Sequence, residues 1–194
     1  TVPALVAALG ARGTRAVVVI SAGFAERGTA EGRALHDATL AAARPYLLRI
    51  IGPNTIGLLV PEVGLNASFA HLSPRTGEIA FVTQSGALLT SVMDWAHSRG
   101  IGFSKLIALG SMADVDFGDT LDYLANDPAT HAILLYVEAV TQPRKFMSAA
   151  RAAARSKPLI VCKSGRHAAG ARAARSHTGA LAGSDAVYDA AFRR

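Results

Sequence analysis

Cysteine and aromatic residues are scarce in this sequence of 194 residues. The single cysteine, Cys162, excludes a disulfide within the chain, and aromatic side chains make up only 6%. Because Cys162 ends the apolar run Pro158–Cys162, we expect a small buried strand residue there rather than a nucleophile. No apolar run approaches the roughly 20 residues that span a bilayer, and no secretory signal opens the chain. These absences predict a soluble, cytoplasmic protein that does not enter a membrane.

Charge is unbalanced toward the positive. Lysine and arginine number 20 against 14 acidic residues, which gives a formal net charge of +6. The low aromatic content and the lack of zinc, helix-turn-helix or stacking motifs nevertheless disfavour a nucleic-acid partner, so a small anionic molecule fits better. The hydrophobic fraction of 51% is typical of a well-packed globular protein. The chain starts at Thr1 without methionine and stops at Arg194 inside a helical pattern, and we therefore expect a fragment of a longer protein.

Several patterns of enzyme families are also missing. The residues two positions before and after Ser85 are not glycine, which disfavours a serine hydrolase of the Gly-x-Ser-x-Gly type. The Rossmann glycine fingerprint is absent too. Asp114, Asp116 and Asp119 are spaced as in a calcium loop, but the glutamate of the twelfth position is lacking. We predict no metal site, and we expect these aspartates to cap a helix and line a pocket.

Strand-like apolar runs recur about every 26 residues in the second half of the chain, with a helical pattern in each gap. This alternation is typical of βαβ units around a parallel sheet. Ser85 is predicted to cap the first of the helices and Asp119 the second, whereas the third is expected over Arg144–Arg155. The expected strands are Ile79–Thr83, Leu106–Leu109, Ala132–Glu138 and Pro158–Lys163.

A smaller α/β unit is expected upstream. Two buried strands are predicted at Arg15–Ser21 and Leu47–Ile51, with a helix over Ala30–Ala43 between them. The segment Pro61–Thr76 has little periodicity, so a domain boundary is predicted there. The predicted domains are residues 1–74 and 75–194.

Polar and glycine residues follow every predicted strand. In an open parallel sheet, ligands bind just beyond the carboxyl ends of the strands. A turn such as that around Ser85 also exposes the N–H groups of a helix N-terminus, which bind anions. The segments that follow the strands are Ser21–Phe24, Gly52–Thr55, Gln84–Gly86, Gly110–Asp114, Glu138 and Lys163–Gly165.

One histidine, His177, stands apart from the other five because small residues surround it in Ser176–Gly183, directly before a predicted helix start at Ser184. A neutral imidazole nitrogen can accept a phosphoryl group if an acceptor holds its other nitrogen. Glu138 is the candidate acceptor, because a carboxylate that ends an apolar strand needs a partner. The alternatives are a capping or surface histidine and a solvated glutamate.

Taken together and in order, these motifs resemble the nucleoside-diphosphate-forming acyl-CoA synthetases, relatives of the α subunit of succinyl-CoA synthetase. The stretch Leu65–Phe117 is similar to bacterial acetate–CoA ligase-like proteins that carry a fused acetyltransferase domain. The motifs that carry the resemblance are Gly52–Thr55, Thr83–Leu88, Ala113–Asp116, Tyr136–Glu138, Lys163–Arg166 and Ser176–Gly183.

The resemblance implies a truncated Rossmann-like CoA-binding unit followed by a flavodoxin-like CoA-ligase domain. It implies that acyl-CoA and phosphate give acyl phosphate and CoA, and that His177, oriented by Glu138, then carries the phosphoryl group toward ADP. The implied phosphate-binding residues are Ser85, Gly86, Thr178, Gly179, Lys163 and Arg166. The implied CoA-binding residues are Ser21, Gly23, Pro53 and Asn54.

The same resemblance implies partners outside this chain. ATP or ADP with magnesium would bind mainly to an ATP-grasp domain or subunit that the chain lacks. Two further expectations are an acetyltransferase domain in the full protein and a homo-oligomer. The alternative function is a CoA-sensing or acyl-CoA-sensing regulatory domain of a protein lysine acetyltransferase.

Overall fold

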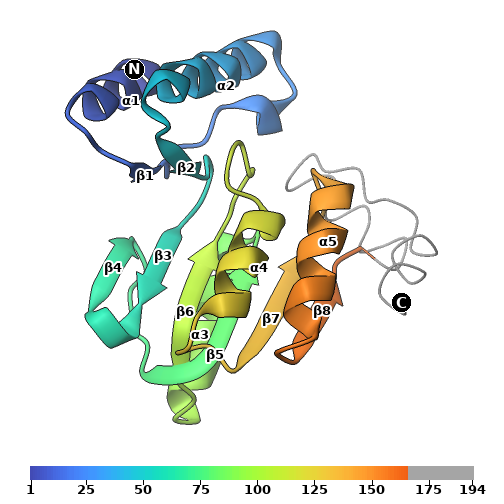
Figure 1. Ribbon diagram of the computed structural model, residues 1–194. Coiled ribbons are helices and arrows are strands. Elements are labelled where there is room, and N and C mark those ends of the chain that lie inside the picture. The colour runs from blue at the N-terminus through green and yellow to red at the C-terminus, as the bar shows by residue number, and fades with distance from the viewer. Residues whose placement is uncertain (166–194) are drawn as a thin grey trace.

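Two separate sheets organise the described part of the chain, residues 1–165 of the computed structural model (Figure 1). The smaller sheet pairs two parallel strands, and the larger has six strands in the order β4-β3-β6-β5-β7-β8. Two helices lie over the small sheet at the top of Figure 1. The elements of this first unit are α1 (Val2–Ala11), β1 (Ala16–Val18), α2 (Ala30–Ala43) and β2 (Arg49–Ile51).

Helix α2 has the bounds that the sequence predicts. It begins after Thr29, whose hydroxyl accepts a hydrogen bond from Gly32 N at 3.1 Å. Helix α1 was not predicted, because it is apolar almost all round and shows no clear 3.6-residue stripe: Val6 is buried whereas Leu5 and Leu9 are exposed. The core of this unit includes Phe24 and Ile50, which are 1% and 0% exposed.

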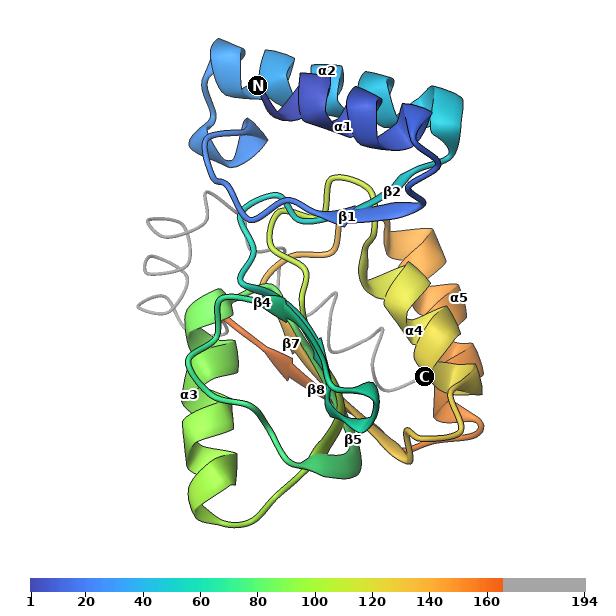
Figure 2. The same cartoon turned by 90° about the vertical axis from the view of Figure 1, so that its left-hand side faces the viewer.

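The four strands predicted in the second half are confirmed and form a parallel array with β5 between β6 and β7. Helix α3 covers one face of this sheet, and α4 and α5 cover the other (Figure 2). The elements are β5 (Thr76–Thr83), α3 (Gly86–Ser98), β6 (Phe103–Ala108), α4 (Phe117–Asn126), β7 (Ala132–Val137), α5 (Pro143–Ala154) and β8 (Leu159–Lys163).

A hairpin widens the large sheet beyond β6. Strands β3 (Gly57–Val60) and β4 (Leu65–Ser68) pair antiparallel, and β3 pairs antiparallel with β6. Close packing explains the glycine at position 57, where a Cβ would lie 2.1 Å from the carbonyl oxygen of Ala67. The first residue whose strand is hydrogen-bonded into the large sheet is Gly57, so this sheet begins before the predicted domain boundary between residues 74 and 75. The domain boundary stays a prediction.

The N-cap of α4 is Asp116, so the prediction of Asp119 is wrong. Asp116 Oδ1 accepts hydrogen bonds from Gly118 N at 2.8 Å and Asp119 N at 3.1 Å, and Asp119 Oδ2 accepts one from Asp116 N. This is a reciprocal capping box. The two residues of the capping box, Asp116 and Asp119, are both aspartates, and the sequence pattern is compatible with either of them as the N-cap.

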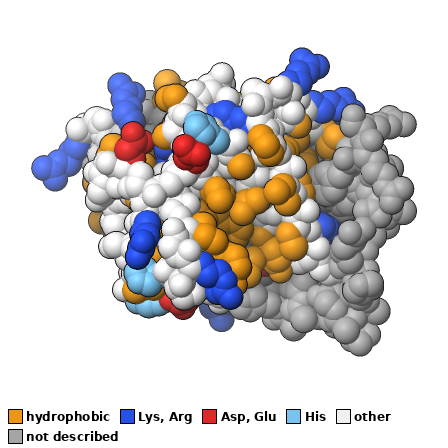
Figure 3. All heavy atoms as spheres, turned by 90° about the horizontal axis from the view of Figure 1, so that it is seen from below, with side chains coloured by type: hydrophobic (Ala, Val, Ile, Leu, Met, Phe, Trp, Pro, Cys, Tyr) orange, Lys and Arg blue, Asp and Glu red, His pale blue; other side chains and the backbone are white. Residues whose placement is uncertain are grey.

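Cys162 is in β8 as predicted, but its predicted burial is wrong, because the side chain is exposed. Among the strands of residues 1–165, β8 is the last of the sheet, and its side chains alternate between partly buried and exposed. Within residues 1–165, no helix has the length and apolar character needed to cross a membrane. Apolar side chains gather on the face of the molecule seen from below in Figure 3.

We predict that the stability of the fold depends strongly on the packing of α4. Replacing Leu121, which is 0% exposed, by alanine should lower the free energy of unfolding by about 2–5 kcal/mol, because a cavity would remain beneath the helix. Urea unfolding measures the change. The matched control Leu5→Ala, at a residue that is 62% exposed, should change it by about 0.5 kcal/mol or less. Equal losses for the two variants would contradict this packing.

Candidate functional site

A cavity of about 250 Å³ lies where the carboxyl ends of β5, β6 and β7 meet the first unit. The expectation that residues following different strands come together is confirmed for the turns after β2, β5, β6 and β7. The first unit contributes Ala25, Glu26, His36 and Asn54, and the large sheet contributes Gln84, Gly110, Ser111, Met112, Glu138, Ala139 and Thr141.

Gln84 joins two of these strand ends. Its side-chain Oε1 accepts hydrogen bonds from Glu138 N at 2.7 Å and Ala139 N at 2.9 Å. Strands β5 and β7 are parallel neighbours, so the turn after one lies beside the end of the other. Glu138 is only 6% exposed. The buried carboxylate therefore lies at the cavity, close to the turn that starts α3.

The N-terminus of α3 is built as the sequence predicts. Ser85 Oγ accepts a hydrogen bond from Leu88 N at 3.3 Å, which confirms Ser85 as the cap. Its own N–H donates to Thr83 Oγ1 at 2.9 Å. Gly86 packs on Ile56, because a Cβ there would lie 3.3 Å from the Ile56 Cβ. The first-turn N–H groups of such a helix, at its positive dipole end, favour an anion.

The residues implied for CoA lie on the turns after β1 and β2. Ser21 O accepts a hydrogen bond from Asn54 N at 2.9 Å, so the two turns touch. Of the four implied residues, the cavity lining includes Asn54. Gly23 has a φ of 107°, which only glycine adopts easily, and Pro53 follows Gly52 through a cis peptide bond.

Glu26 is a cavity residue that sequence reasoning missed. Its Oε1 accepts hydrogen bonds from Gly23 N at 2.6 Å and Phe24 N at 3.0 Å, while Oε2 lies 3.5 Å from Ser111 Oγ. The carboxylate thus holds the turn after β1 and faces the loop after β6. The spacing Gly-x-x-Glu at residues 23–26 could have indicated this role, since an acidic side chain can accept hydrogen bonds from the N–H groups of a nearby turn.

His36 was also missed, because it sits in an ordinary amphipathic pattern on α2. The side chain lines the cavity. Its Nδ1 is buried and has no hydrogen-bond partner within residues 1–165. Nothing in the spacing of α2 distinguishes this histidine from one that faces solvent, so only the tertiary structure reveals it.

The loop between β6 and α4 binds the first unit through its backbone. Ser111 N donates to Pro53 O at 2.9 Å, Ala113 N to Gly52 O at 2.9 Å, and Val115 N to Ile50 O at 3.1 Å. Gly110 lies so close that a Cβ would be 2.3 Å from Pro53 O. The loop therefore runs along the segment after β2 like an added strand.

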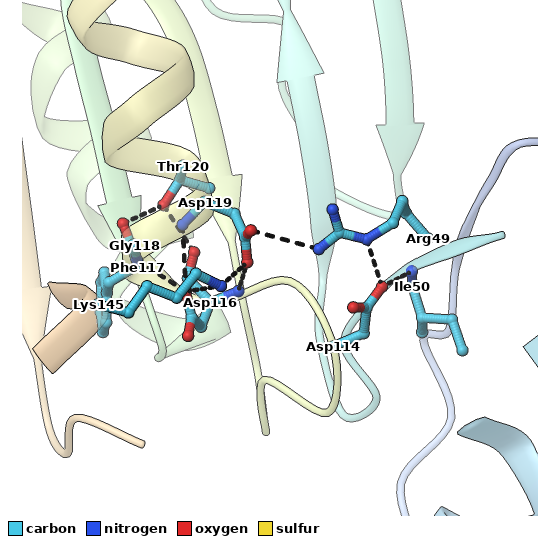
Figure 4. A network of polar contacts seen from close by, with 9 residues as sticks. All are labelled: Arg49, Ile50, Asp114, Asp116, Phe117, Gly118, Asp119, Thr120 and Lys145. Atoms are coloured by element: carbon cyan, nitrogen blue, oxygen red, sulfur yellow. Dashed lines mark hydrogen bonds and ion pairs between the residues drawn. The ribbon is translucent and has the colours of Figure 1, made fainter. Parts of the chain in front are cut away.

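An ionic network reinforces this contact (Figure 4). Asp114 Oδ2 accepts hydrogen bonds from Arg49 Nε at 2.9 Å and Ile50 N at 2.8 Å. Arg49 also lies 3.4 Å from Asp119 Oδ1, and Lys145 Nζ lies 2.5 Å from Asp119 Oδ2. The hydrogen bond that Arg49 donates to Asp114 raises the pKa of the guanidinium, although partial burial works against it.

The aspartates of this network cap a helix and join two units, and they do not line the strand-end cavity. The pocket-lining part of the expectation holds for Asp119. Asp119 borders a separate apolar hollow beside β3 and β6. Burial raises the pKa of Asp119, but the hydrogen bonds from Lys145 and Asp116 N outweigh it, and the pKa lies below the ordinary value of 3.8.

Lys163 ends β8, and its Nζ donates to Ser164 O at 2.5 Å. It is not among the described residues that line the cavity. The remaining predicted residues, Arg166, His177, Thr178 and Gly179, lie outside the described part of the chain. Their assignment, and that of Lys163, stays a prediction.

A largely parallel α/β sheet thus places a helix start and a buried carboxylate at neighbouring strand ends, the edge at which open α/β sheets bind their ligands. Residues 76–194 match the family model of the succinyl-CoA ligase-like flavodoxin domain. The chain belongs to this family, and the predicted family and fold are confirmed.

Named relatives resemble the whole chain. It is 45% identical over 193 residues to an ADP-forming acetate–CoA ligase I of Archaeoglobus fulgidus, covering 100% of this chain and 28% of the relative. It is 42% identical to the α subunit of an ADP-forming acetate–CoA ligase I of Pyrococcus furiosus, again covering 100% of this chain and 42% of the relative.

Solved structures agree. A dinucleotide-forming acetyl-coenzyme A synthetase 1 of Ca. Korarchaeum cryptofilum, in complex with phosphate and ADP, superposes with a TM-score of 0.90 at 38% identity, covering 98% of this chain and 41% of that one. The chain thus spans less than half the length of each of these proteins.

The ionic network predicts an acid-sensitive stability. Because the folded pKa of Asp119 lies below its unfolded value of about 3.9, its stabilisation is complete above that value and is lost as pH falls through the folded pKa. Urea unfolding should show Asp119→Asn less stable than wild type at pH 7, with the difference shrinking below about pH 4.

Asp122→Asn is the matched control, since Asp122 is an exposed carboxylate on the same helix. Its free energy of unfolding should equal that of the wild type at every pH. A difference between Asp119→Asn and wild type that persists unchanged at the lowest pH would contradict the charge-based account.

Proposed function

We propose that this chain is part of an ADP-forming acyl-CoA synthetase that passes a phosphoryl group between acyl phosphate and ADP through a phosphohistidine. Membership in the succinyl-CoA ligase-like flavodoxin family supports the proposal, and so do the names of relatives over 40% identical across the whole chain. The part of those relatives that this chain does not cover would supply the nucleotide chemistry.

The proposed reaction has two transfers in this unit. Phosphate oxygen attacks the thioester carbonyl of acyl-CoA, the C–S bond breaks, and acyl phosphate forms while the thiolate leaves as CoA. An imidazole nitrogen of His177 then attacks phosphorus, the P–O bond to the carboxylate breaks, and the free acid leaves. ADP later takes the phosphoryl group from the histidine.

The observation that carries this proposal is the pair of hydrogen bonds from Glu138 N and Ala139 N to Gln84. They hold a buried carboxylate beside the turn that starts α3. We assign phosphate to the helix start at Ser85 and Gly86. The first-turn N–H groups that follow Ser85 and the positive end of the helix dipole compensate its charge there, while the N–H of Ser85 itself is held by Thr83 Oγ1. We assign to Glu138 the hydrogen bond that orients the imidazole and stabilises its charge as phosphorus is attacked.

We assign coenzyme A to the turns of the first unit, because these turns offer an open backbone and polar groups. The backbone at Gly23 is open, since a Cβ there would meet only Arg27 Cδ at 4.0 Å, so a ligand can approach the chain closely. Ser21 and Asn54 provide polar groups beside it, with Asn54 on the cavity wall. When bound, CoA supplies the thiol that becomes the thioester.

A second domain or subunit of the ATP-grasp type is proposed as the partner that binds ADP, ATP and magnesium. The Pyrococcus furiosus relative is named as an α subunit, which supports a division of labour between two parts. The apolar patch in Figure 3 also favours a covered surface in the whole protein. An acetyltransferase domain and a homo-oligomer remain proposals about the full-length protein.

Phosphorylation of the full-length protein tests the proposal. Incubation with ATP and magnesium should give an acid-labile phosphoryl group that His177→Asn abolishes, because asparagine has no nitrogen that can accept it. His97→Asn, at an exposed residue of α3, is the control and should label as the wild type does. Equal labelling of wild type and His177→Asn would overturn the assignment.

Glu138→Gln should slow the phosphorylation about 10²–10⁴-fold, because an amide cannot stabilise the developing imidazolium. Rapid-quench labelling measures the rate. A wild-type rate in this variant would remove Glu138 from the mechanism. If the intact wild-type protein binds acyl-CoA but shows neither labelling nor synthetase activity, the sensory alternative replaces the enzyme.

A further inference from the structure

Met112 is the large apolar side chain among the described residues that line the strand-end cavity; the other apolar lining residues are Ala25 and Ala139. The side chain is 6% exposed. It also belongs to the main core cluster, together with Leu109 and Phe117. Met112 therefore fills space between the core and the cavity, and its size helps to set the cavity's size.

The backbone of Met112 is held on both sides. Ser111 N and Ala113 N donate to Pro53 O and Gly52 O at 2.9 Å each, and Met112 N donates to Leu109 O at 3.3 Å. Its φ of 51° is in the left-handed region, which non-glycine residues adopt rarely. Strained residues of this kind persist when their surroundings fix them, and they gather at ligand sites.

Three other wall residues offer less freedom to change the cavity's size. Gln84 and Glu26 are each tied by two backbone hydrogen bonds, and Gly110 has no side chain. A volume of about 250 Å³ corresponds to only about eight water molecules at ~30 Å³ each. The cavity thus has room for a phosphate with an aliphatic group beside it, and Met112 is the large apolar wall that such a group would meet.

We propose that Met112 is a specificity-determining residue that limits the acyl group to short aliphatic chains. The inference rests on the proposed function, which puts the acyl phosphate in the cavity that Glu138 and Met112 both line. The thioether packs against the first carbons of the chain, and its burial within the main core cluster limits the room it has to move aside. Butanoate is then a poorer substrate than acetate.

Full-length Met112→Ala and Met112→Gly test this. The ratio of kcat/KM for butanoate to kcat/KM for acetate should rise at least about tenfold in both, because one or two methylenes in an apolar pocket are worth that much. Glycine removes the left-handed strain as well as the side chain. Met93→Ala is the matched control: Met93 is 2% exposed on α3 and outside the cavity lining, so its ratio should stay at the wild-type value.

An unchanged ratio in both Met112 variants, with acetate activity and phosphohistidine labelling intact, would overturn the role of Met112 and leave the proposed function standing. A rise of the same size in Met93→Ala would also overturn it, because general loosening would then be the cause. If the wild type neither labels nor forms acetyl-CoA, the proposed function itself fails.

Discussion

The backbone hydrogen bonds between the loop after β6 and the segment after β2 are the contact on which the site depends. Three loop N–H groups donate to the carbonyls of Ile50, Gly52 and Pro53. These bonds seat the small unit on the carboxyl edge of the large sheet. Together with the hydrogen bond from Thr55 Oγ1 to Ala108 O at 2.6 Å, they fix Asn54 and Glu26 relative to Gln84 and Glu138 around the strand-end cavity.

The charged side chains act on the same contact. Arg49 and Asp114 link β2 to the loop, and Asp119 and Lys145 extend the link to α4 and α5 (Figure 4). The capping box of Asp116 and Asp119 means that one short segment both starts a helix and joins two units. That double use explains why acidic residues are concentrated there.

Much of the fold follows from periodicity. Helix α3 has a serine cap, an apolar stripe and a left-handed Gly100, so its limits are visible in the sequence. The hairpin β3–β4 was not predicted, because its strands are four residues each and Pro61 interrupts them. Helix α1 was not predicted because its apolar residues surround it. The burial of Cys162 was predicted wrongly because the apolar run does not show which side chains of β8 are covered.

The strand-end rule located Asn54, Gln84, Gly110 and Glu138, since connectivity alone places these turns at one edge. It could not find Glu26 or His36, which reach the cavity from a turn and a helix packed above the sheet. Nor could it show that Met112 would face both core and cavity, because that depends on how the loop is pinned against Pro53.

A crystal structure of the full-length protein with CoA and phosphate would test most directly whether this cavity is the place of reaction. The account predicts phosphate at the start of α3, next to Gln84 and Glu138, with the CoA thiol entering between Asn54 and Met112. Phosphate and thiol both bound elsewhere, with this cavity filled only by water, would contradict it.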